Sequence, residues 1–139
     1  MVQHQKVFCI GFHKTGTSTL SKALRILWYS VTGPNGNRDP DIQNNLYSLV
    51  YDLAYQYDAF QDNPWPLVYR EMDRLHPACK FILSVRDTNE WIESQVRYFG
   101  FKTTPMREMI YGRGCPAGNE EIYIKTYEQH NKNVKDYFK

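Results

Sequence analysis

The segment that most constrains this chain is a glycine-containing loop between an apolar run and a helical pattern. The apolar run 7–10 is followed by residues 11–19, which read GFHKTGTST, and then by leucine and alanine at helical spacing over 20–27. A continuous apolar run of this kind is typical of a buried parallel strand. A loop that joins such a strand to a helix turns backbone N–H groups inward, and the positive end of the helix dipole lies behind it. The segment therefore predicts a binding site for a phosphate-bearing ligand.

The position of the lysine distinguishes this loop from that of nucleoside-triphosphate enzymes. Their pattern, G-x-x-x-x-G-K-[ST], places the lysine directly after the second glycine. Here Thr17 follows Gly16, and the lysine is Lys14, inside the loop. A small-molecule kinase also needs a carboxylate at a strand end for magnesium, and Asp87 stands beside Arg86. A P-loop kinase is therefore the less favoured alternative.

Apolar runs and helical patterns alternate along the chain, with no internal repeat and no domain boundary. We expect strands at 6–12, 57–60 and 80–85, loops at 32–37 and 100–118, and helices at 17–29, from 39 to beyond 54, 65–76, 88–99 and 119–138. Alternation of this kind predicts one α/β domain over 1–139, a three-layer α/β/α architecture around a short central parallel sheet. Ligands bind such sheets at the carboxyl ends of the strands. The glycine loop, Asp62 and Arg86 all leave expected strand ends, so we expect them to share one crevice.

Composition narrows the class of protein. The net charge of +2 does not suggest a nucleic-acid surface, and no apolar run approaches the ~18 residues of a membrane helix. The segment 1–6 is polar and too short for a signal peptide. The three cysteines have no metal-ligand spacing, so we expect no metal site and a reducing compartment, which predicts a cytoplasmic protein.

Two motifs together resemble the sulfotransferase superfamily, whose donor is 3′-phosphoadenosine-5′-phosphosulfate (PAPS). Residues 12–18, FHKTGTS, are similar to its 5′-phosphosulfate loop, and residues 85–94, VRDTNEWIES, are similar to its 3′-phosphate motif. Segments 62–66 and 127–131 also resemble the P-loop sulfotransferase-like branch. Each of the two main motifs lies at an expected strand-to-helix junction. The resemblance implies transfer of a sulfuryl group to a hydroxyl or amine of a small-molecule or glycan acceptor, with 3′-phosphoadenosine-5′-phosphate (PAP) as product.

The resemblance also implies roles for particular residues. Lys14 would neutralise the bridging oxygen of the donor as its bond to sulfur breaks. The 5′-phosphate would be held by the loop residues, which are His13, Lys14, Thr15, Gly16, Thr17 and Ser18. Arg86 and Ser94 would hold the 3′-phosphate, because an arginine at a strand end can bind a phosphate with two donors and Ser94 follows about two helical turns later. The alternative for Arg86 is an ion pair with Asp87 or Glu90.

The general base is not evident from the resemblance. Many relatives use a mid-chain histidine, whereas this chain has histidine only at 4, 13, 76 and 130. Asp62 is the candidate, because it follows an expected strand and should face the crevice. The alternative is that Asp62 caps a helix that starts near Pro64. His13 is a second candidate base, with donation to a phosphate or to backbone as its alternative, and His130 is expected to pack or hydrogen-bond on the last helix.

Two further features separate this chain from many relatives. Thr19 stands where an aromatic residue commonly stacks on adenine, and relatives usually continue beyond the position of Lys139 with a strand and a basic loop. A non-catalytic protein that binds PAP, PAPS or a partner is therefore a second hypothesis. The chain is rich in aromatic residues, and some of them could line an acceptor pocket that is covered by a lid formed by 101–118. The alternative is that they belong to the core. These residues are Tyr47, Tyr51, Tyr55, Trp65, Tyr98 and Phe99. The sequence does not indicate an oligomeric state.

Overall fold

A four-stranded parallel sheet lies at the centre of the structure. The computed structural model describes residues 5–139, and the first four residues of the polar segment 1–6, His4 among them, lie outside this range. The strands are β1 (Val7–Cys9), β2 (Val31–Thr32), β3 (Ala59–Phe60) and β4 (Lys80–Ile82). Their order is β2-β3-β1-β4, and every adjacent pair is parallel. All carboxyl ends of the strands therefore point to the same edge of the sheet.

Helices follow each strand. They are α1 (Thr17–Ile26), α2 (Ile42–Gln56), the 3₁₀ turn η1 (Trp65–Leu67), α3 (Tyr69–Leu75), α4 (Thr88–Phe99), α5 (Pro105–Tyr111) and α6 (Glu120–Tyr137). No helix within residues 5–139 is both long enough and apolar enough to cross a membrane.

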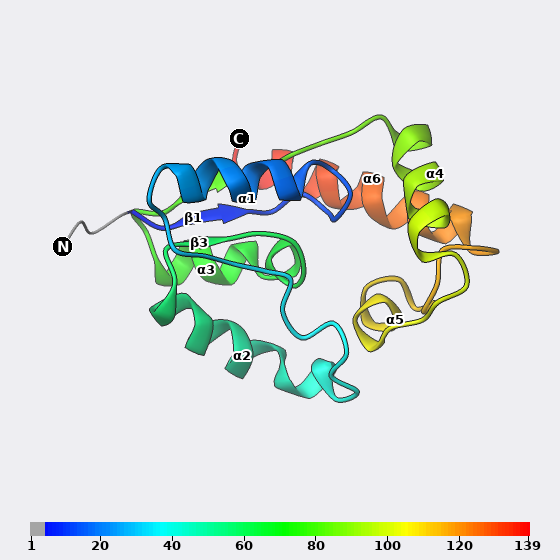
Figure 1. Cartoon of the computed structure of the whole chain (residues 1–139), viewed down its shortest axis with the longest axis horizontal. Coiled ribbons are helices and arrows are strands. Elements are labelled where there is room, and N and C mark those ends of the chain that lie inside the picture. The colour runs from blue at the N-terminus through cyan, green and yellow to red at the C-terminus, as the bar shows by residue number, and fades with distance from the viewer. Residues whose placement is uncertain (1–4) are drawn as a thin grey trace.

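Alternate side chains of β1 and of Ile10, the residue after it, pack into two layers of the core. Phe8 and Ile10 pack with apolar residues of α2, α3 and α6. Val7 and Cys9 pack against Leu24 of α1 on the opposite face. Figure 1 shows α1 on one side of β1 and β3, and α2 and α3 on the other. The predicted α/β fold with a short central parallel sheet and helices on both faces is confirmed.

A third apolar cluster lies beyond the carboxyl ends of the strands. It is centred on Phe12 and joins α4, α5 and α6 through Trp91, Ile92, Tyr111, Tyr123 and Tyr127. Figure 1 shows α4 and α5 at this end of the molecule. The cluster gives the loop after β1 a rigid apolar support, because Phe12 belongs to that loop.

Several predicted boundaries were wrong. The strands are shorter than expected, and β2 occupies part of a segment predicted as loop, because two residues are too few to show strand periodicity. The helix predicted over 65–76 divides at Val68 into η1 and α3.

The prediction of a structureless loop over 100–118 was also wrong, because α5 lies within it. The local signals for this helix were present. Pro105 occupies its first turn, the Thr104 side chain accepts a hydrogen bond from the Arg107 N–H at 3.1 Å, and Gly112 ends the helix in the left-handed conformation. The density of glycine and proline in the segment concealed a short, well-capped helix.

Candidate active site

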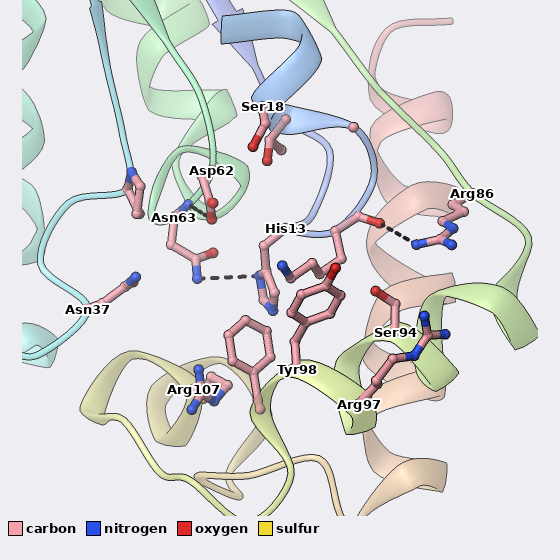
Figure 2. A pocket seen from close by; sticks show the side chains of 15 residues that line it. His13, Ser18, Asn37, Asp62, Asn63, Arg86, Ser94, Arg97, Tyr98 and Arg107 are labelled. Atoms are coloured by element: carbon pink, nitrogen blue, oxygen red, sulfur yellow. Dashed lines mark hydrogen bonds between the residues drawn. The ribbon is translucent and has the colours of Figure 1, made fainter.

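The loops that follow all four strands line one cleft of about 460 Å³. Figure 2 shows its side chains converging from these loops and from α4 and α5. Those that come from the sheet edge are Pro34 and Asn37 after β2, Asp62 and Asn63 after β3, the residues from His13 to Ser18 other than Thr15 after β1, and Arg86 after β4. Ser94, Arg97, Tyr98, Phe99 and Arg107 complete the lining. The parallel topology thus brings residues from distant parts of the sequence to a common site.

The N-terminus of α1 opens on this cleft. Gly16 is its N-cap, with a left-handed φ of 94°, and no side chain caps the helix. The N–H of Leu20 donates to the Gly16 carbonyl at 3.1 Å. The N–H groups of the three residues between them precede the first helical hydrogen bond, so they are available to an anion. Thr17 and Ser18 bring their hydroxyl groups to the same place.

The loop is also fixed to the segment that follows β4, through Ser84. The Thr15 hydroxyl lies 2.5 Å from the Phe12 carbonyl oxygen and 2.7 Å from Ser84 Oγ. A Cβ atom on Gly11 would lie 2.3 Å from the Ser84 carbonyl oxygen, so only glycine allows this approach. Thr15 was expected to hold phosphate through its backbone N–H; its side chain does not line the cleft and braces the loop.

His13 is buried within the loop, with 5% of its surface exposed. Its Nε2 lies 3.0 Å from Gln95 Oε1, and its Nδ1 lies 3.4 Å from Asn63 Nδ2. Because Gln95 Nε2 donates to the His13 carbonyl, Gln95 Oε1 is the acceptor and His13 Nε2 carries the proton. Burial lowers the pKa of His13, against the opposing effect of Asp62. The ring is therefore neutral, and its Nδ1 accepts from the Asn63 amide.

Lys14 adopts a left-handed backbone conformation, with φ of 65°. Its Nζ lies 3.6 Å from the centre of the Tyr98 ring and 5.5 Å from that of Phe99. These aromatic faces hold the ammonium group within the cleft without neutralising it by a carboxylate. The Lys14 carbonyl accepts a hydrogen bond from Arg86 Nη1 at 3.3 Å, which joins the two sequence motifs.

Arg86 and Ser94 lie on the same side of the cleft (Figure 2). The Arg86 backbone is held by Tyr127 of α6, whose hydroxyl accepts from the Arg86 N–H at 2.8 Å and donates to the Arg86 carbonyl at 2.9 Å. The alternative expected for Arg86 was an ion pair with Asp87 or Glu90. The pair with Glu90 is present, because Arg86 Nε lies 3.8 Å from a Glu90 carboxylate oxygen, and this pair is exposed. Asp87 instead caps α4 by accepting from the Glu90 N–H.

Asp62 lies across the cleft from Arg86 in Figure 2 and shares the left-handed backbone conformation, with φ of 65°. Its carboxylate accepts from the Asn63 N–H at 2.7 Å. No side chain caps η1 or α3, so the alternative role of Asp62 as a helix cap was wrong. His130 lies outside this cleft, stacks on Phe12 and donates Nε2–H to the Ile10 carbonyl at 2.8 Å, which is the packing role expected of it.

The structure thus brings together all the predicted site residues except Thr15. Of the aromatic candidates for a pocket, only Tyr98 and Phe99 line the cleft, Trp65 is in the core, and Tyr47, Tyr51 and Tyr55 are exposed on α2. Residues that the sequence analysis missed are Asn37, Asn63, Gln95, Arg107 and Tyr127. Asn63 and Tyr127 lie in the segments 62–66 and 127–131 that resemble the family, and Gln95 is next to Ser94, so these three carry a local signal. No three His, Cys, Asp or Glu side chains between residues 5 and 139 form a group that could hold a metal ion.

Comparison with known proteins agrees with this geometry. A family model described as a sulfotransferase domain matches residues 6–116, a span that includes both predicted motifs, Asp62 and α5. A search of curated proteins found no match. Since the matched span covers most of the chain and every loop that lines the cleft, the chain belongs to the sulfotransferase domain family.

Proposed function

We propose that this protein transfers a sulfuryl group from PAPS to a hydroxyl or amine of an acceptor. The observation that carries the proposal is the convergence of two separate anion-binding groups, the N-terminus of α1 and the pair Arg86–Ser94, on the cleft that contains Lys14 and Asp62. PAPS carries phosphate at both its 5′ and 3′ positions. Two groups of donors in one cleft fit such a ligand better than they fit a nucleotide with phosphate at one end only.

The donor set fits the phosphates chemically. The free N–H groups of α1 and the hydroxyls of Thr17 and Ser18 would hold the 5′-phosphosulfate. Arg86 offers a planar fork that can bind the 3′-phosphate with two hydrogen bonds, and Ser94, with 3% of its surface exposed, adds a hydroxyl beside it. Tyr127 fixes the Arg86 backbone, so little ordering would be needed on binding.

Bound PAPS supplies an activated sulfuryl group on its phosphosulfate bond. The Lys14 ammonium group would offset the charge that develops on the 5′-phosphate as that bond breaks, an effect that is strong inside a cleft. Asp62 would take the proton from the acceptor hydroxyl or amine as the new bond to sulfur forms. His13 is unsuited to that step, because its Nδ1 lone pair is engaged by Asn63.

The test is turnover of PAPS in the presence of a mixed panel of phenols, alcohols and amines, with formation of PAP as the readout. We expect Lys14→Ala to lower the rate by about 10²-fold or more, because it removes charge stabilisation in the transition state. Lys22→Ala is the matched control, since it removes the same charge from an exposed position of α1. Equal rates for Lys14→Ala and the unaltered protein would contradict the role of Lys14. Binding of PAP without any turnover would favour the non-catalytic alternative.

A further inference from the structure

Arg107 of α5 brings a buried guanidinium group into the same cleft. The residue exposes 7% of its surface, yet it lines the cavity. Its Nε donates to the Gly114 carbonyl at 3.1 Å, and its Nη2 donates to the Lys102 carbonyl at 2.7 Å. The guanidinium carbon lies 4.4 Å from the centre of the Phe99 ring. These contacts hold the group rigidly at the cleft wall.

Every one of these partners is neutral. Among residues 5–139 no carboxylate lies within ion-pairing distance of Arg107. Burial lowers the pKa of the guanidinium group, and the nearby groups that oppose this effect are Tyr123, Tyr111 and Cys115, none of them a carboxylate. A buried cation without a counter-ion is costly, so a position of this kind is suited to an anion that arrives with a ligand.

Arg107 lies away from the residues assigned to the donor. Figure 2 shows it on the side opposite Arg86 and Ser94, with Asn37 and Asn63 on its side of the cleft. The loop that carries Asn37 contacts α5 directly, since the Met106 N–H donates to the Asn37 carbonyl at 3.3 Å. The cleft therefore has a second end, formed by β2, β3 and α5, which PAPS would not need.

Two side-chain oxygens at this second end have no partner. Asn37 Oδ1 and Asn63 Oδ1 are buried and accept no hydrogen bond within the described part of the chain. The Asn63 amide nitrogen is already directed at His13. Buried acceptors without donors are uncommon in folded proteins, and both residues line the cleft. Hydroxyl or amine groups of a ligand would satisfy them.

We propose that the acceptor carries a carboxylate that pairs with Arg107, in addition to the hydroxyl or amine that receives the sulfuryl group. This inference rests on the proposed function, and it identifies the acceptors as hydroxy acids or amino acids. Nε and Nη2 of Arg107 hold two backbone carbonyls, which leaves Nη1 to donate to a carboxylate. The side-chain oxygens of Asp62, Asn37 and Asn63 belong to the same end of the cleft and are acceptors suited to the hydroxyl or amine. The same end of the cleft would bind a neutral alcohol or amine more weakly.

The test measures equilibrium binding by calorimetry, with and without saturating PAP. The probes are hydroxy acids and amino acids of three to nine carbons, each paired with its neutral primary amide. We expect at least one acid to bind about tenfold tighter than its amide, or ~1.4 kcal/mol. Arg107→Gln should abolish this preference and leave the affinity for PAP unchanged. Arg113→Gln, which removes the same charge from an exposed loop position, should keep the preference.

Each outcome bears on one claim. If every acid binds no better than its amide, or if Arg107→Gln weakens PAP binding instead, the inference is overturned while the proposed function stands. If PAP does not bind, the proposed function fails. The affinities of each acid and its amide are still compared in the absence of PAP, so the inference about Arg107 is tested separately. The comparison of acid with amide binding in the unaltered protein needs no variant. It therefore tests the preference for a carboxylate even if Arg107→Gln does not fold. Arg107→Lys, which keeps the charge but loses the fork, should retain part of the preference.

Discussion

Two residues in the cleft have a backbone conformation that side chains other than glycine rarely adopt. Within residues 5–139 the non-glycine residues with positive φ are Lys14, Trp28 and Asp62. Such a conformation costs roughly 1 kcal/mol or more and persists where the surroundings impose it, often at functional sites. Lys14 and Asp62 are the two proposed catalytic residues. The strain supports their roles independently of the sequence motifs.

Asp62→Asn separates the charge of this residue from its backbone role. Asparagine tolerates the left-handed conformation, and its side-chain oxygen can still accept from the Asn63 N–H, so we expect the fold to be kept. Turnover should fall by about 10²-fold or more, because the amide cannot take a proton from the acceptor. Asp52→Asn, at an exposed position of α2, is the control in the same kinetic assay. Unaltered turnover in Asp62→Asn would mean that another group is the base.

At the scale of residues, the sequence indicates which residues lie in the site better than it indicates which residues they contact. Lys14, Arg86 and Ser94 could be assigned because they stand in local motifs. Burial lowers the pKa of His13, and the hydrogen bonds that fix its ring come from Asn63 and Gln95, which are 50 and 82 residues away in the chain. Local patterns carry no information about such pairs, so His13 could not be excluded as a base from the sequence.

At the scale of elements, α6 acts as a support for the loop after β4. Tyr127 is buried and contacts both the N–H and the carbonyl of Arg86. It also stacks on Trp91 of α4, with 4.1 Å between the ring centres. The helix itself was predicted from its spacing of apolar residues. Its effect on the site was not, since a tyrosine on an apolar face does not show what its hydroxyl binds.

Tyr127→Phe tests this support. The change removes two partly buried hydrogen bonds to the N–H and the carbonyl of Arg86, which water can replace in part, so we expect a loss of about 0.5–1.5 kcal/mol in the free energy of unfolding. Affinity for PAP should fall as well, because Arg86 is no longer held in position. Tyr123→Phe is the matched control, since that hydroxyl donates to the Arg113 carbonyl instead. Denaturant titration and calorimetry would measure the two effects. Equal affinity for PAP in both variants would argue against a role for Tyr127 in the site.

At the scale of the whole molecule, the cleft is a consequence of parallel topology. The alternation of strands and helices in the sequence was enough to predict a parallel sheet and a crevice at its carboxyl edge. The order of the strands could not be predicted from the sequence, because β2 is two residues long and shows no strand pattern. The contribution of Asn37 and Arg107 to the cleft follows from β2 and α5, the two elements that the sequence analysis missed.

Stability of the fold should depend on pH in a defined direction. Burial lowers the pKa of both His13 and His130 below their ordinary value of 6.5. Below about pH 6.5 the unfolded chain therefore binds protons that the folded chain does not, and the free energy of unfolding decreases as pH falls. We expect the thermal midpoint to drop between about pH 7.5 and 5.5, above the range in which carboxylates titrate. A midpoint that is constant or rises over this interval would contradict the burial of neutral histidine.

The central claim is that one cleft recognises a nucleotide with phosphate at both its 5′ and 3′ positions. The most direct measurement is the thermal midpoint with PAP, compared with AMP and ATP, which lack the 3′-phosphate. We predict a rise with PAP alone, equivalent to ~2.7 kcal/mol at a hundredfold excess over its dissociation constant. Arg86→Gln should greatly reduce that rise. An equal rise with AMP and PAP, or no rise with PAP, would contradict the assignment of Arg86 and Ser94 to the 3′-phosphate.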